Sequence, residues 1–568
     1  MSMSSDVSAL PLSPWLRLWT WVSVVLGLLT TSIPLLFMAT KIFSMSGFSA
    51  LKAIALSASG HRLIINTIAL ALMVAVIGTF LGATTALAIT VLPLPGKIWW
   101  HRGLLFPSLL GPFIIPVILI VSIGRSGILF SGFFLFGFDL YGFWGISLCQ
   151  IISLTPTAYL ITLSALRTIN PQLLTGVATL GVSNFQIMRS VVFPVVRQPI
   201  RQAFMILMVE SAADLATPLV LGGKYRVLTA ALYSQAVSAN SLETASVYAL
   251  ILATFSLGII LLTRSFTPPL AAFYSSGWFS NQTWRSCLTP VEPLALVLIG
   301  IAVGQSLIGW VVTAALGAMI LHTTWLWLHQ PITGTISAVS LVAPLSNSFL
   351  LATIAVPLIA FLALGISLAR PQKCVPRIFY GITRLSLQLP SSVLTFALLC
   401  AFARPWRWGD YQLMPTLVGG TSWGQGAIAI VIAYTLRCLN LAINIIEIDL
   451  RRINPLWWEI TSTLGIRQDR QQNEILVPNL KVSIIKATGL SFLTVLSSLS
   501  TVAFLPSTSW EVLTMSMLAQ MDGANYGHLF LSSAILFLIT AGSQVLSAHF
   551  RRRQHRAIGA VAIPGGTS

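Results

Sequence analysis

Long apolar runs constrain this chain more than any other feature of its sequence. A helix needs about 20 apolar residues to cross the hydrocarbon core of a bilayer, and only 8% of the residues are charged, against about 25% in a soluble domain. The sequence therefore predicts an all-α polytopic membrane protein and excludes a water-soluble globular one. We expect about 12 transmembrane helices, near residues 15–40, 63–92, 103–124, 141–166, 198–221, 246–263, 293–326, 346–369, 380–402, 424–446, 484–505 and 527–549.

The charged residues indicate how the chain is oriented. Its formal net charge is +18, but the charges lie between apolar runs and form no patch, so we expect a lipid bilayer as partner and no nucleic acid. Lys and Arg accumulate in cytoplasmic loops, and the loop after the fourth run and the C-terminal tail are rich in Arg. Both termini are therefore predicted to be cytoplasmic. Lys41, Lys52 and Arg62, in the first external loop, go against this rule. The first run is longer than the core of a signal peptide, so we expect it to remain as a span.

An internal repeat divides the chain into halves. Arg-Thr-Ile-Asn-Pro at 167–171 recurs as Arg-Arg-Ile-Asn-Pro at 451–455, and Thr-Leu-Gly-Val at 179–182 recurs as Thr-Leu-Gly-Ile at 463–466. The offset, 465 − 181 = 284, is half of the 568 residues. Six spans per half give both halves the same orientation, as in parallel repeats. We predict a first transmembrane domain at 1–265, a cytoplasmic linker at 266–290 and a second domain at 291–568. Asn66-Thr67 and Asn347-Ser348 are a weaker match between the halves.

The repeated segment has the start and stop residues of a short helix. Each copy contains an Asn suited to the N-cap, a Pro suited to the first turn and, about ten residues later, a Gly suited to the position after the last turn. These are Asn170, Pro171 and Gly181 in the first copy and Asn454, Pro455 and Gly465 in the second. An apolar stripe follows each helix: Leu173, Val177 and Leu180, or Trp457, Thr461 and Leu464. The stripe packs on the chain's own bundle or the lipid surface, or it docks on a partner; both interpretations stay open.

The segment resembles the EAA loop of binding-protein-dependent ABC transporter permeases, the MetI-like family. That pattern is Glu-Ala-Ala, three residues, Gly, and a Pro thirteen residues after the Gly. Gly181 with Pro194, and Gly465 with Pro478, have this spacing, within EAA-type loops at 167–200 and 451–483. Thr175 and Glu459 occupy the Glu position, so the first copy departs from the pattern.

The resemblance implies how the chain would work. In that family the loop docks on a cytoplasmic ATPase and transmits its closure to the spans, so two copies imply two ATPase subunits. The chain has no GxxxxGK[ST] motif, which is the loop that cradles nucleotide phosphates, so we expect a transport subunit that is not an enzyme. Cargo would be delivered by a periplasmic binding protein to a bacterial inner membrane. No catalytic residue, metal site or cofactor is predicted.

Two fused halves of this type resemble the permeases of ferric-iron and thiamine uptake systems. The stretches 210–223 and 497–505 resemble the ferric-iron type most closely, so ferric iron is the expected cargo. Thiamine, a polyamine or a phosphonate stay open as alternatives, because each would need similar spans.

Few ionisable residues lie within the runs, and such residues are candidates for a functional role. Glu210 and Asp214 are spaced i, i+4 near the end of the fifth run, which places them on one helical face. With Ser497 and Ser500 of the second half, they are the candidate translocation pathway. Either the two acids face the pathway, or they are hydrated at the external end. Arg437, inside the tenth run, would pair with an acid of a neighbouring helix or extend to the membrane surface.

Two other function classes compete with this prediction. An ion-coupled secondary transporter would use Glu210 and Asp214 for coupling and need no ATPase, but the doubled loop argues against it. A membrane enzyme, such as a lipid-linked transferase, needs a polar catalytic cluster at one membrane face, and the sequence has no such set.

Overall fold

The computed structural model describes residues 13–92, 95–110, 114–124, 140–167, 169, 177, 179–239, 241–264, 292–329, 339–369, 374–408, 411–419, 425–453, 460–461, 463–507, 509–523, 529, 531–539 and 542. The predicted linker 266–290 lies outside them. In the first half the elements are α1 Pro14–Ile42, α2 Met45–Leu56, α3 Ala58–Val91, α4 Lys97–Leu109, α5 Ile114–Ile123, α6 Phe143–Leu166, α8 Asn184–Ile187, the π-helical η2 Met188–Val192, α9 Phe193–Ala213, α10 Ala216–Leu221, α11 Leu228–Tyr233, η3 Ser234–Ser238 and α12 Leu242–Arg264. In the second half they are α13 Glu292–His329, α14 Val339–Leu368, α15 Cys374–Ser386, α16 Ser391–Phe402, β1 Trp406–Trp408, β2 Tyr411–Met414, α17 Ala427–Arg452, α19 Gln468–Gln471, η7 Gln472–Leu476, α20 Val477–Ser497 and α21 Leu513–Asp522.

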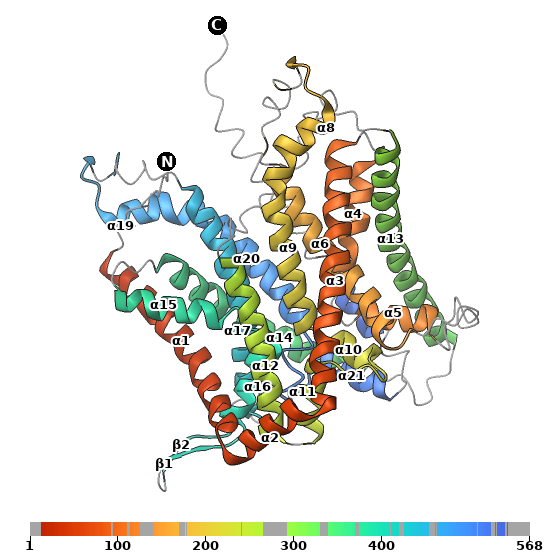
Figure 1. Cartoon of the computed structure of the whole chain (residues 1–568). Helices are drawn as coiled ribbons and strands as arrows, with labels where there is room; N and C mark the ends of the chain where they lie inside the picture. Colours follow the sequence, from red (N-terminus) through yellow and green to blue (C-terminus); the bar gives the residue numbers. More distant parts are fainter. Residues whose placement is uncertain are drawn as a thin grey trace.

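The molecule is a bundle of long apolar helices (Figure 1). Among the described residues, nine helices are long and apolar enough to cross a membrane, or ten if one bent pair counts as a span. This confirms an all-α polytopic membrane protein. The count of 12 is not reached in the described part of the chain, where the last predicted span, 527–549, is helical over 531–539.

Two of the predicted spans are broken helices. The ninth, 380–402, consists of α15 and α16, which are bent by 103°. Pro390 directly precedes α16, and a proline disfavours helix in the residue before it, so the break falls where the sequence places the ring. The third, 103–124, consists of α4 and α5, and the backbone leaves the helix at Leu110, with ψ of 126°.

Two other spans begin and end earlier than predicted. The fifth apolar helix runs from Met188 to Ala213 instead of 198–221, and the eleventh from Glu474 to Ser497 instead of 484–505. Periodicity did not detect these ends, because the residues that follow are as apolar as a helix interior. Short elements, α10 and the turn at 498–505, continue the chain instead.

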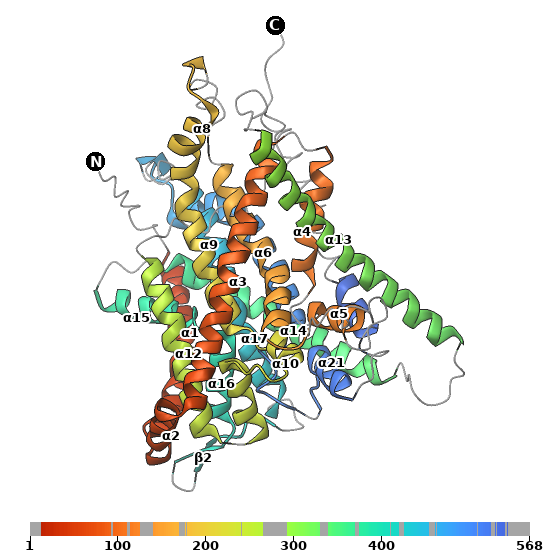
Figure 2. The same cartoon turned by 45° about the vertical axis from the view of Figure 1, so that its right-hand side comes forward.

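The first helix of each half packs on the other half. α1 contacts α14, α15 and α16 of the second half, and α13 contacts α3 and α4 of the first. Figure 2 shows α13 crossing beside α3 and α4. At this crossing, a Cβ added to Gly309 would lie 1.9 Å from the carbonyl oxygen of Gly103. The two helices therefore approach at glycine backbones, as small residues allow in membrane bundles.

The two ends of the bundle differ. α8 and α19 lie at one end, where α1 also begins, and α2 and the β1–β2 hairpin lie at the other (Figures 1 and 2). The hairpin is antiparallel and pairs Arg407 with Gln412. Phe37 of α1 stacks on Trp406 with ring centroids 5.0 Å apart, so the hairpin is held by the helix that crosses from the first half.

Candidate functional site

The segments after the two repeated helices have the same structure. In each, a four-residue helix, a π-helical turn and a 21-residue helix follow one another: α8, η2 and α9, then α19, η7 and α20. The start of α9 and the start of α20 differ by 477 − 193 = 284 residues. The offset found in the sequence is therefore also the offset between equivalent structural elements. We call residues 177–200 and 460–483 the first and second coupling segments, after the role that the resemblance to the EAA loop predicts for them.

The repeated glycines adopt the conformation that their position in the pattern predicts. Gly181 has φ of 73° and Gly465 has φ of 64°, in the left-handed region that ends helices and favours glycine. The Glu-position residues of the pattern, Thr175 and Glu459, lie outside the described residues. The stop of each short helix is thus observed, and its start stays a prediction.

One apolar side chain of each stripe is exposed. The side chain of Leu180 is 79% exposed and that of Leu464 is 69% exposed, and both directly precede the glycine. Val177 is half-buried against the first-half core, and Thr461 is buried. The inner part of the stripe therefore packs on the bundle, and its outer end presents an apolar side chain at the end of the molecule where α8 and α19 lie (Figure 1).

The prolines of the pattern begin the long helices. Pro194 and Pro478 each stand in the first turn of α9 and α20. The amides of Phe193 and Val477 donate to carbonyls five residues earlier, Met188 and Gln472. Because proline has no N–H to give an α-helical bond, both copies enter the span through a wider turn, a feature often found at functional sites.

Glu210 lies near a cation of the other half. Its side chain, on α9, is exposed, and so is that of Arg437 on α17, whose helical neighbours are largely buried. The charge of Arg437 acts electrostatically on Glu210. The two charges attract each other across the halves, and whether Arg437 pairs with an acid or extends to the membrane surface stays a prediction. Sequence spacing could not reveal this, because the two residues belong to different halves.

Asp214 has different surroundings from Glu210. α9 ends at Ala213, and the Asp214 carboxylate accepts hydrogen bonds from the Ala216 amide and from Nε2 of Gln150, both at 3.0 Å. The Ser211 hydroxyl donates to Oε1 of the same Gln150 at 2.6 Å. Asp214 therefore ties the break between α9 and α10 to α6. The expectation of two acids on one continuous helix is wrong, because the carboxylate caps the next helix instead.

The two serines of the candidate pathway also make local contacts. Ser497 donates to the Leu493 carbonyl of its own helix at 3.0 Å. The hydroxyl of Ser500 lies 3.1 Å from that of Ser391, at the start of α16. The four candidate residues thus lie at or near the ends of the equivalent helices α9 and α20: Glu210 in the last turn of α9, Asp214 directly after it, Ser497 at the end of α20 and Ser500 three residues later.

The weak Asn-Thr and Asn-Ser match has an equivalent role in both halves. Asn66 donates to the carbonyl of Arg226 at 3.0 Å and Asn347 to that of Glu511 at 3.1 Å. The next residues, Thr67 and Ser348, accept from the amides of Leu228 and Leu513 at 2.9 and 2.8 Å. Each pair holds the segment before α11 or α21, so the repeat extends beyond the coupling segments.

Two acidic residues near the end of α17 were not identified from the sequence as candidate functional residues. Glu447 and Asp449 form ion pairs with Arg384 and Lys486, directly before the second coupling segment. A run of acids at the end of an apolar span was a visible signal. Among the described residues, no three His, Cys, Asp or Glu side chains lie together in a way that could hold a metal ion.

Comparison with known proteins identifies relatives of both halves. The family described as "Binding-protein-dependent transport system inner membrane component" matches residues 99–270 and again residues 361–556. The chain is 24% identical over 503 residues to the ferric transport system permease protein FbpB of Actinobacillus pleuropneumoniae, covering 84% of this chain and 69% of the relative. It is 25% identical over 481 residues to the "Putative ferric transport system permease protein FbpB 1" of Haemophilus influenzae, covering 79% of this chain and 71% of the relative.

Proposed function

This chain belongs to the family of binding-protein-dependent transport system inner membrane components, and we propose that it carries ferric iron. Membership makes it a multi-pass inner membrane protein with two fused permease domains, which acts as the transport subunit of an ABC importer. Such subunits work with ATPase and binding-protein partners. The names of both relatives specify ferric transport, which supports ferric iron over thiamine, a polyamine or a phosphonate.

The two coupling segments receive one ATPase subunit each. The observation that carries this proposal is the duplicated geometry: the left-handed glycine, the exposed leucine before it and the π-helical turn after it recur in each copy. An exposed apolar side chain at the end of a short helix suits a groove on a partner. Thr175 and Glu459 complete the two loops, and the sequence has no GxxxxGK[ST] motif.

Transport then follows from alternating access. ATP-driven closure of the ATPases pushes the segments Gly181–Pro194 and Gly465–Pro478, and the spans that they begin, α9 and α20, move with them. The candidate pathway residues lie at or near the ends of these two helices, so this movement reaches them: Glu210, Asp214, Ser497 and Ser500. An acid near the pathway favours a cationic cargo by simple attraction. We propose from the Arg-rich coupling loops that both termini are cytoplasmic, and that a periplasmic binding protein docks at the α2 end.

Replacing the two glycines tests the coupling. Gly181→Leu and Gly465→Leu force a side chain into the left-handed region, which costs about 1 kcal/mol or more, and add bulk where the ATPase docks. We expect each variant to lose most of its co-purifying P-loop ATPase and its ATP-dependent uptake of radiolabelled ferric iron in proteoliposomes. Gly300→Leu on α13, where an added Cβ meets nothing within 4 Å, is the control. Persistence of both association and uptake in the double variant contradicts the coupling role.

A ligand panel tests the cargo separately. The partner binding protein is titrated with ferric iron, thiamine, a polyamine and a phosphonate, and uptake of each bound ligand is measured with the wild-type chain. Ferric iron is expected to bind and to be transported. If only another ligand is taken up, the proposal of ferric iron as cargo is wrong, and the assignment of the chain as a permease is unaffected.

A further inference from the structure

The helix that leads into the second coupling segment is tied to two neighbouring helices by acidic side chains. Glu447 and Asp449 stand near the end of α17, which ends at Arg452. Each acid binds a different helix, α15 or α20. We call Glu447 and Asp449, with their partners Arg384, Tyr380, Lys486 and Ser483, the α17 clamp.

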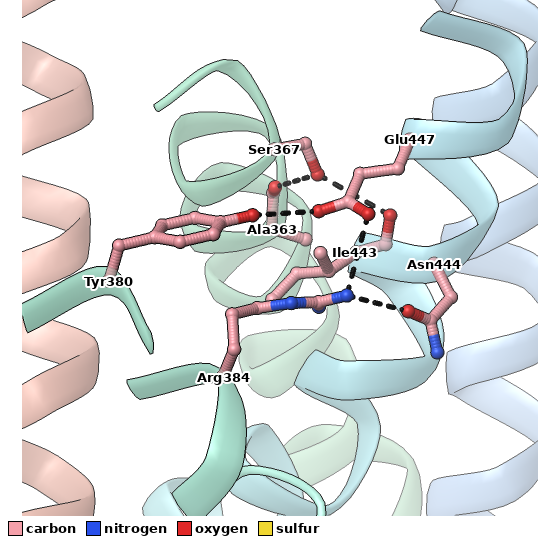
Figure 3. A network of polar contacts seen from close by, with 7 residues as sticks. All are labelled: Ala363, Ser367, Tyr380, Arg384, Ile443, Asn444 and Glu447. Atoms are coloured by element: carbon pink, nitrogen blue, oxygen red, sulfur yellow. Dashed lines mark hydrogen bonds and ion pairs between the residues drawn. The ribbon is translucent and has the colours of Figure 1, made fainter. Parts of the chain in front are cut away.

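Glu447 joins α17 to α15 (Figure 3). Its Oε2 lies 3.4 Å from Nη2 of Arg384, and its Oε1 accepts a hydrogen bond from the Tyr380 hydroxyl at 2.9 Å. The same Nη2 donates to Oδ1 of Asn444, one turn earlier on α17, at 2.9 Å. The side chains of Arg384 and Glu447 are only 15% and 16% exposed. A guanidinium held by two acceptors on one helix face fixes both the distance and the register between the helices.

Asp449 joins α17 to α20. Its Oδ2 accepts a hydrogen bond from the Ser483 hydroxyl at 2.5 Å and lies 3.7 Å from Nζ of Lys486. The side chains of Lys486 and Asp449 are 23% and 17% exposed. α20 is the helix that leaves the second coupling segment. The clamp therefore connects the helix before the segment with the helix after it.

The first half lacks these charges at the equivalent positions. Subtracting the offset of 284 places Leu163 opposite Glu447 and Ala165 opposite Asp449. The same offset places Gln202 opposite Lys486. α15 begins 374 − 97 = 277 residues after α4, and this offset places Pro107 opposite Arg384. There α4 and α6 are joined instead by an uncharged contact, with Nδ1 of His101 2.6 Å from the Tyr159 hydroxyl. The ionic connection is thus a property of one half only.

We propose that Glu447 and Asp449 are positioning residues that make α15, α17 and α20 move as one body when the second coupling segment is pushed. The inference rests on the proposed function and names residues that transmit the movement of the coupling segment to the spans. Pairs shielded from water keep their attraction, whereas exposed pairs are screened. When the second coupling segment is displaced, α15 and α20 therefore move together with α17. The helices of the second half shift less relative to one another than those of the first half.

Neutralising each acid tests the proposal in the complete complex. Glu447→Gln and Asp449→Asn are reconstituted with the ATPase subunits and the binding protein, and uptake of radiolabelled ferric iron is divided by ATP hydrolysed. We expect ATPase association and hydrolysis to persist while uptake per ATP falls about fivefold, the lower end of typical coupling effects. The exchange Arg384→Glu with Glu447→Arg restores the ion pair and should restore the ratio.

The controls separate transmission from folding. Glu511→Gln changes an exposed acid in the segment before α21, outside the clamp, and should leave the ratio at the wild-type value. Where Glu447→Gln does not fold, Tyr380→Phe removes the 2.9 Å hydrogen bond to Glu447 and keeps the ion pair, and it should lower the ratio in the same direction. A ratio that stays at the wild-type value in the folded variants overturns the proposal, as does a charge exchange that behaves no better than Glu447→Gln.

A cargo-free measurement keeps the two hypotheses distinguishable. Lys224 and Ser509 are exposed residues of the external segments of the two halves. Spin labels on Lys224→Cys and Ser509→Cys, in a chain whose five native cysteines are replaced by Ser, report the distance between these segments with and without ATP. The change expected in the wild type should be reduced in Glu447→Gln, in line with its lower uptake per ATP. If the wild type opens with ATP but takes up no ferric iron, the cargo is wrong; if Glu447→Gln opens equally, the clamp is wrong.

Discussion

A buried histidine–tyrosine contact connects α4 and α6 near the first coupling loop. His101 is enclosed by the bundle and lies between Arg102 and Arg167, so burial and then these positive charges lower its pKa from 6.5 to about 4. The ring is therefore neutral at pH 7, and its Nδ1 can accept from the Tyr159 hydroxyl. Protonation would place a third positive charge in this cluster.

The lowered pKa of His101 predicts acid sensitivity. Between pH 6.5 and 4 the unfolded chain binds a proton that the folded chain excludes, so stability falls as the pH falls through this window, by roughly 3 kcal/mol in total. His101→Gln removes this loss: its melting temperature in detergent should lie below the wild type at pH 7.5 and approach or exceed it at pH 4.5. His61→Gln, at an exposed site, should follow the wild-type curve. Parallel curves for His101→Gln and wild type would contradict the assignment.

At single residues, the sequence predicted conformations better than partners. Gly181 and Gly465 have the left-handed backbone that a helix stop requires, because such a stop is set by local sterics. The Asp214 carboxylate accepts hydrogen bonds from the first amide of α10 and from Gln150. The charge of Arg437 acts electrostatically on Glu210. The contacts with Gln150 and Arg437 join residues 64 or more positions apart and depend on packing that no spacing rule encodes. The roles of Thr175, Glu459, Ser497 and Ser500 stay proposals.

Among the helices, prediction succeeded where a long apolar run is uninterrupted. α1, α3, α6, α12, α14 and α17 match the predicted spans to within a few residues at most ends. It failed where a break is made by one residue inside an equally apolar run, as at Leu110, Asp214 and Pro390. Hydropathy indicates which residues are buried in lipid and not which backbone dihedrals they adopt. A break at one residue therefore does not change the mean hydropathy of the run. The hairpin at 406–414 was missed for the related reason that its strands are three and four residues long.

The crossing of α13 over α4 depends on glycine. A Cβ at Gly309 would lie 1.9 Å from the Gly103 carbonyl oxygen, so Gly309→Ala must push the helices apart, and such overpacking costs about 1–3 kcal/mol. We expect a melting temperature in detergent several degrees lower than wild type. Gly304→Ala, on the same helix with nothing within 4 Å, should be neutral or slightly stabilising, because alanine favours helix over glycine. Equal stability of the two variants would mean that α13 does not pack on α4 in this way.

For the whole molecule, the repeat predicted two halves but not the exchange of their first helices. α1 packs on α14, α15 and α16, and Trp19 contacts Phe361 with ring centroids 5.3 Å apart. α13 is held on the first half by hydrogen bonds from Ser306 to the Trp100 carbonyl and from Thr85 to Gln305. A repeat shows which segments are equivalent, whereas which copy they pack on depends on the connection between them. Each half is therefore incomplete without the other.

This exchange predicts that the two halves fold only together. Residues 1–265 and 291–568, expressed as separate chains in one cell, should assemble and co-purify, because the contacts of α1 and α13 do not need a covalent link. Either chain alone leaves the faces that bind the exchanged helix uncovered and should be degraded or aggregate, as seen by size-exclusion chromatography of the detergent extract. Removing residues 1–56 from the first chain, which deletes α1 and α2, should weaken assembly with the second half. A first half that is monodisperse and stable alone would show that the exchange contributes little, and the two domains would then be independent folding units joined by their linker.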